Sequence, residues 1–122
     1  MESILLCQVD EKTATKIKRL AGAKKIAVKT ITSDLFNENL KTLVQGKKCQ
    51  TEADRVKDRN PDAPSQSLML FCGLSEKHLD KLLFEMRRDK LEVDYKAVLT
   101  ATNQNWTMHR LYQEMQREKA NL

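Results

Sequence analysis

One alternation of short apolar runs with amphipathic segments occurs twice in this sequence of 122 residues, and no other feature restricts the fold as strongly. Each apolar run has the length and composition of a strand. Each amphipathic segment has apolar residues three or four positions apart, as in a helix that buries one face. The runs expected to form strands are 3–9, 26–31, 68–74 and 95–100. A strand followed by a helix, four times over, predicts the α/β class.

Residues that commonly begin helices precede all four amphipathic segments. They are Asp10, Ser33 or Asp34, Ser75 and Thr107. Gly22 is expected to end the first helix in a left-handed conformation, and Gly46 to end the second. The predicted inward faces are Ala14, Ile17, Leu20 and Ala21; Leu35, Phe36, Leu40, Leu43 and Val44; Leu79, Leu82, Leu83 and Met86; and Met108, Leu111, Tyr112 and Met115.

The two halves of the sequence match position by position, which indicates an internal repeat. At a shift of 65, the difference between Cys72 and Cys7, the strand, cap and helix positions of the first βα unit coincide. At a shift of 68, the difference between Thr100 and Thr32, the match continues through the second unit. The prediction is a first βαβα repeat at 3–46, a polar linker at 47–67 and a second βαβα repeat at 68–119.

The repeats are expected to share one four-stranded sheet within a single domain, 1–122, with helices packed on it. A helical crossover makes the two strands of each repeat parallel. The first and third strands are the most uniformly apolar, so we place them in the middle and predict the order 2-1-3-4. The pattern leaves two alternatives open: the two halves run parallel, or a pseudo-twofold axis relates them and the central pair is antiparallel.

Composition favours a soluble protein of the cytoplasm. Hydrophobic residues make up 40% of the chain and charged residues 32%. No apolar run approaches the roughly 18 residues of a membrane span, and the N-terminus lacks the pattern of a secretory signal. The three cysteines are expected to be reduced, with Cys7 and Cys72 in equivalent core positions and Cys49 exposed in the linker.

The net charge of +5 raises the question of nucleic acid. Basic and acidic residues are interleaved along the sequence, which is typical of solvated helix faces. Aromatic residues, which could stack on bases, are only 5% of the chain. This pattern disfavours a nucleic-acid partner.

Two stretches of the second half resemble a known family. They are LFCGLS at 70–75 and YKAVLTATNQNW at 95–106, separated by a leucine-rich helix. Together they resemble the bacterial domain-of-unknown-function family 3783. The resemblance implies a small bacterial cytoplasmic protein and carries no activity with it.

Ligands of open α/β sheets bind beyond the carboxyl ends of the strands, where helix N-termini also offer free N–H groups to an anion. The residues at and beyond the ends of the third and fourth strands therefore form the candidate site for a small polar or anionic ligand. They are Gly73, Thr100, Thr102, Asn103, Asn105 and Trp106, and Lys96 within the fourth strand could add a positive charge. The alternative is purely structural, because turns and helix caps use the same threonine and asparagine residues.

The function expected from the sequence is a non-enzymatic binding or regulatory module that uses these loops. Its partner would be a small polar ligand or a protein, and it would be a monomer or a homodimer. The first alternative is an enzyme with an unrecognised site built on Thr100, Asn103 and Cys72, and the second is a nucleic-acid-binding protein. We assign no catalytic residue, metal or cofactor. His78 and His109 match no metal-ligand pattern and are expected on the surface.

Overall fold

The computed structural model describes residues 2–32, 35–36, 38–45 and 66–120. Strands and helices alternate in it, as predicted. In chain order they are β1 (Ser3–Cys7), α1 (Glu11–Gly22), β2 (Ala27–Ile31), α2 (Leu40–Gln45), β3 (Leu68–Cys72), α4 (Glu76–Arg88), β4 (Tyr95–Val98), the 3-10 turn η2 (Asn103–Asn105) and α5 (Met108–Ala120). The α/β class is therefore confirmed.

The chain divides into two compact units, and each contains segments from both predicted repeats. The sheet unit comprises Met1–Thr30 and Gln66–Val98, with α1 and α4. The helical unit comprises Ile31–Ser65 and Leu99–Leu122, with α2, η2 and α5.

The four strands form one sheet in the order β2-β1-β3-β4, which confirms the predicted order. Strands β3 and β4 are parallel, whereas β1 and β3 are antiparallel, which decides between the two alternatives that the sequence left open. The antiparallel register places Leu5 opposite Leu70 and extends evenly to both sides. Leu5 and Leu70 are equivalent at the shift of 65, so the pairing is centred where a pseudo-twofold axis between the repeats would lie.

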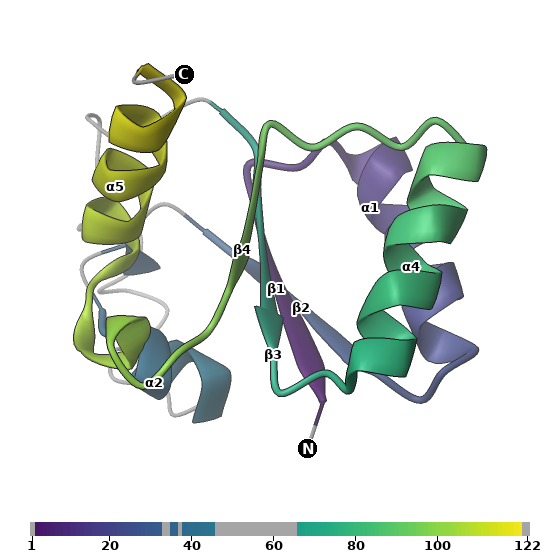
Figure 1. The fold of residues 1–122 in the computed structure, drawn as a ribbon, viewed down its shortest axis with the longest axis horizontal. Helices are drawn as coiled ribbons and strands as arrows, with labels where there is room; N and C mark the ends of the chain where they lie inside the picture. Colours follow the sequence, from purple (N-terminus) through teal and green to yellow (C-terminus); the bar gives the residue numbers. More distant parts are fainter. Residues whose placement is uncertain (1, 33–34, 37, 46–65, 121–122) are drawn as a thin grey trace. The chain divides into compact units, whose positions relative to one another are not determined.

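Helices α1 and α4 lie side by side on one face of the sheet (Figure 1). Alternate residues of the strands face these two helices. They are fully or almost fully buried: Ile4, Leu6, Met69 and Phe71. The helices contribute Ala14, Ile17, Ala21, Leu82 and Met86 to the same core. Both helices have the predicted caps: the side chains of Asp10 and Ser75 accept the N–H groups of Thr13 and His78.

The backbone of the sheet unit fits the predicted repeat. Four described residues have a positive φ, and they form two pairs at the shift of 65. The first pair is Gln8 and Gly73, with φ of 56° and 71°. The second is Lys25 and Lys90, with φ of 60° and 57°.

The lysine pair occupies the position that glycine usually holds at the end of a helix. The N–H of Lys25 bonds to Gly22 O and that of Ile26 to Ala21 O, both at 3.0 Å, as in a Schellman motif. The predicted left-handed turn at Gly22 is therefore wrong. Helix α1 runs through Gly22, and the left-handed residue is Lys25, three positions later.

Several predicted boundaries also change. The strands end earlier than expected, at Cys7, Cys72 and Val98, because the connections to the helices begin there. The second helix was predicted to include Leu35 and Phe36 but begins only at Leu40. Ser33, Asp34, Gly46 and the linker up to residue 65, with Cys49, lie outside the described residues.

The helical unit has its own core around Phe36. This ring stacks on Tyr112 with 5.5 Å between ring centroids and meets the edge of His109 at 5.9 Å. Backbone bonds join the same segments, from Leu40 N to Trp106 O at 2.8 Å and from His109 N to Phe36 O at 3.1 Å. An antiparallel bridge pairs Asn39 with Thr107, which are equivalent at the shift of 68, so this unit also fits a two-fold relation between the repeats.

Candidate functional site

The predicted loop after β4 is held by a reciprocal pair of hydrogen bonds. Asn103 Oδ1 accepts the N–H of Thr100 at 2.8 Å, and Thr100 Oγ1 accepts the N–H of Asn103 at 3.1 Å. Asn103 is buried, with 8% of its surface exposed. These contacts make Thr100 and Asn103 parts of a turn that leads into η2, in accordance with the structural alternative.

The other predicted residues of this loop are more accessible. Thr102 and Asn105 are exposed, and Trp106 is half-buried beneath the guanidinium of Arg110, 4.6 Å from the ring centroid. Thr107 Oγ1 accepts the N–H of Arg110 at 3.2 Å, so the predicted cap of α5 is confirmed. Trp106 and Arg110 therefore lie together at the start of α5.

Gly73 and Lys96 belong to the sheet unit, whereas the other five predicted site residues belong to the helical unit. The positive φ of Gly73 recurs at Gln8, so it serves the connection from strand to helix in both halves of the sheet unit. Lys96 is exposed on β4.

The N-terminus of α4, which the sequence offered to an external anion, is occupied by Glu2. This carboxylate accepts the N–H of Ser75 at 2.9 Å and pairs with Nδ1 of His78 at 2.8 Å. The bond from Ser75 and the pairing with His78 both lower the pKa of Glu2. His78 is thus held at the helix start and His109 packs against Phe36, and both residues remain partly exposed.

The two described cysteines are buried and free. Burial raises the pKa of Cys7 to about 12 and that of Cys72 to about 11. Both thiols are therefore protonated at neutral pH, which suits core residues and opposes a role as nucleophile.

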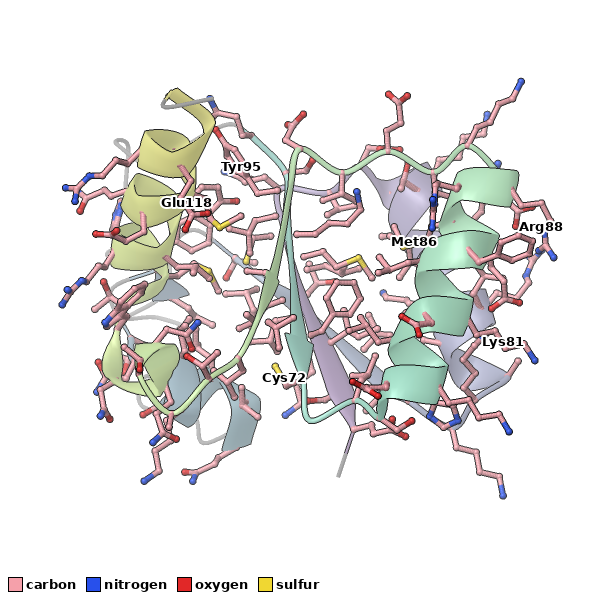
Figure 2. All side chains as sticks on the ribbon, viewed as in Figure 1. Cys72, Lys81, Met86, Arg88, Tyr95 and Glu118 are labelled. Atoms are coloured by element: carbon pink, nitrogen blue, oxygen red, sulfur yellow. The ribbon has the colours of Figure 1, made fainter. Side chains whose placement is uncertain are left out.

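The sheet unit carries a surface that the sequence analysis did not identify, which we call the basic face. It consists of exposed cations on α1 and α4: Lys12, Lys16, Arg19, Lys77, Lys81 and Arg88. Lys77, Lys81 and Arg88 are separated by four and seven residues, so they lie along one side of α4. Lys81 and Arg88 extend from the outer side of this helix, whereas Met86 points toward the sheet (Figure 2).

Most of the net charge of the chain resides in the sheet unit. Its sequence contains 13 basic and 9 acidic residues, a net charge of +4, whereas the helical unit contains 9 and 8, a net charge of +1. On α4, Asp80 is three residues from Lys77 and is therefore its neighbour on the helix surface, whereas Glu76 is three or four residues from neither Lys77 nor Lys81.

Few of these cations are neutralised by a neighbouring acid. Among the described residues, Arg88 alone of the basic face forms an ion pair, with Asp89 at 2.9 Å. Arg88 and the nearby Lys16 lower the pKa of Asp89. Lys16, Arg19, Leu20 and Asp89 line a surface cavity of about 320 Å³ between the two helices.

The signal for this face was present in the sequence. Lys12, Lys16 and Arg19 have the same spacing as Lys77, Lys81 and Phe84, each set shifted by 65. Helical spacing predicts that each helix carries its cations on one side, and packing of the first and third helices on one face of the sheet would place these two sides on one surface. The order of charges along the chain does not show this arrangement.

Residues 67–122 match the family described as Domain of unknown function (DUF3783), which confirms the resemblance of the C-terminal half. No curated protein and no solved structure matches the chain. None of the helices in the described residues is long and apolar enough to cross a membrane. The described part of the chain contains no group of three or more histidine, cysteine or carboxylate residues that could hold a metal ion.

Proposed function

We propose that this protein is a non-enzymatic binding module and that its basic face binds an anionic partner. The observation that carries the proposal is the net charge of +4 in the sheet unit, with cations of both helices on one exposed surface. A surface of one sign raises the local concentration of oppositely charged partners and speeds their association.

The geometry of the face supports this use of the charge. Lys16 and Arg19 border the cavity from α1, and Lys81 and Arg88 project from the outer side of α4. Lysine and arginine side chains bury part of their stems while their charged ends remain in water. An anion that replaces this water gains several charge-assisted hydrogen bonds at once.

The proposal moves the binding surface away from the loop that the sequence favoured. The side-chain oxygens of Thr100 and Asn103 accept each other's backbone N–H groups, which explains their presence without a ligand. The enzyme alternative used the same two residues with Cys72, whose raised pKa opposes nucleophilic attack. A reducing compartment such as the cytoplasm suits the free Cys7 and Cys72.

Retention on a heparin column tests the proposal. The variant K16Q/K81Q removes two cations from the basic face. The matched control K18Q/R87Q removes two exposed cations from the same helices at positions that do not face the same way. We expect K16Q/K81Q to elute at clearly lower salt than the control, because only the first pair belongs to the face. Equal elution of the two variants would show that net charge alone governs retention and would refute the proposal.

A further inference from the structure

One large apolar side chain stands in the middle of the cations on α4. Phe84 is 61% exposed and is the most exposed large hydrophobic residue among those described. It follows Lys81 by three residues and precedes Arg88 by four, so the three side chains are neighbours on the helix surface. An exposed phenylalanine contributes little to a core, and most of this side chain is accessible to solvent.

The repeat makes this residue more unusual. At the shift of 65, Phe84 corresponds to Arg19, another member of the basic face. The position therefore points outward in both repeats, and one of them has an aromatic ring where the other has a guanidinium. A ring and a guanidinium share the ability to stack on a planar π-system.

We propose that the basic face binds single-stranded nucleic acid, with Phe84 stacking on a base while the surrounding lysine and arginine side chains contact the phosphates. The proposal rests on the proposed function, and it specifies the partner. Proteins that bind single strands without sequence preference combine a basic track with aromatic rings that stack on bases.

Other anionic partners use this surface less well. In a duplex the base faces are already stacked, so an exposed ring finds no partner there. A protein interface of ordinary size needs an apolar centre of many side chains, and the basic face offers a single one. A free phosphate or carboxylate would use the cations but not the ring.

Fluorescence anisotropy with a labelled oligothymidylate of about 12 nucleotides tests the proposal, since a strand of this length lies within the site sizes of single-strand binders. We expect Phe84→Ala to weaken binding about tenfold, within the range that loss of one stacked base produces. Phe84→Trp should restore it, because a larger ring still stacks. The control Val98→Ala truncates another exposed apolar residue, 48% exposed, and should bind as the wild type does.

Salt dependence separates this proposal from the more general one. Each phosphate contact contributes about 0.7 to the slope of log affinity against log salt for a single strand, so K16Q/K81Q should reduce the slope by about 1.4. Phe84→Ala should leave the slope unchanged. A reduced slope in K16Q/K81Q together with wild-type affinity in Phe84→Ala would overturn the stacking proposal and keep the anion-binding face. An unchanged slope in K16Q/K81Q would overturn both. Equal affinity of the wild type for a duplex of the same sequence would also overturn the choice of single strands.

Discussion

The ion pair between Lys24 and Glu85 links the end of α1 to α4 in the sheet unit, and its removal tests how the two helices are held together. The side chain of Lys24 is 6% exposed and that of Glu85 is 15% exposed. Lys24 Nζ also donates to Leu20 O at 3.3 Å. Lys24→Met and Glu85→Leu each remove one charge and leave the other in a largely buried site.

The expected cost of each substitution is about 2 kcal/mol. Breaking a fully buried pair costs about 3–5 kcal/mol, because the remaining charge has lost its partner and cannot regain water. Here the cost is smaller, because Glu85 keeps some access to solvent and Lys24 keeps its bond to Leu20. The double variant removes both charges and should cost no more than either single variant. The coupling free energy is then at least about 2 kcal/mol.

Urea unfolding followed by far-ultraviolet circular dichroism gives the four free energies of this cycle. The exposed pair of Arg88 and Asp89, whose side chains are 54% and 39% exposed, supplies the comparison. Its coupling should stay below about 1 kcal/mol, since exposed ion pairs are weak. A coupling below about 0.5 kcal/mol for Lys24 and Glu85, or equal coupling for the two pairs, would refute the reasoning from burial.

Three further predictions concern the backbone, the loop and the response to acid. Lys25→Gly and Lys90→Gly should each raise the free energy of unfolding in urea by about 1 kcal/mol, because glycine adopts a left-handed backbone conformation without strain. Lys25→Ala keeps a Cβ and should give no such gain. Asn103→Ala should cost about 1–2 kcal/mol, because it removes a buried side chain whose amide oxygen accepts the N–H of Thr100. The exposed Asn105→Ala should stay within about 0.5 kcal/mol, and similar values for the two variants would contradict the assigned turn. The pKa of Glu2 in the folded protein lies below its ordinary value of 4.5, so this carboxylate stabilises the fold above that pH and loses the effect as pH falls through the lowered pKa. The free energy of unfolding of Glu2→Gln should therefore differ from that of the wild type at neutral pH and converge with it in acid. A difference that stays constant with pH would exclude the effect.

Much of the fold could be predicted because local and tertiary signals agree. The run LMLFC at β3 is apolar at every position and all five residues are buried, which suits a central strand. Asp10, Ser75 and Thr107 cap the helices that follow them, since a side-chain oxygen at those positions satisfies a free N–H group. Such signals depend on a few neighbouring residues, and tertiary contacts reinforce them here.

Other features depend on information that a linear pattern does not contain. The direction of β1 relative to β3 is set by how the two halves meet, and each half has the same pattern in either arrangement. The left-handed residue at the end of α1 is Lys25 instead of Gly22, because the hydrogen bonds of the turn fix the backbone against local propensity. In the loop, threonine and asparagine would look the same in a cap or in a ligand site, and only the bonds between Thr100 and Asn103 distinguish the two.

The register of β1 against β3 has a consequence for each half of the chain on its own. A polypeptide with only residues 66–122 would retain β3 and β4 but would expose one edge of β3, five apolar residues long. Such an edge recruits another strand. Because the observed pairing is centred on Leu5 and Leu70, a second copy of the half-chain could supply its own β3 in the same direction and register, with Leu70 opposite Leu70. That contact is isologous and closes after two copies. In the full chain β1 and β3 belong to one polypeptide, so their pairing does not depend on protein concentration.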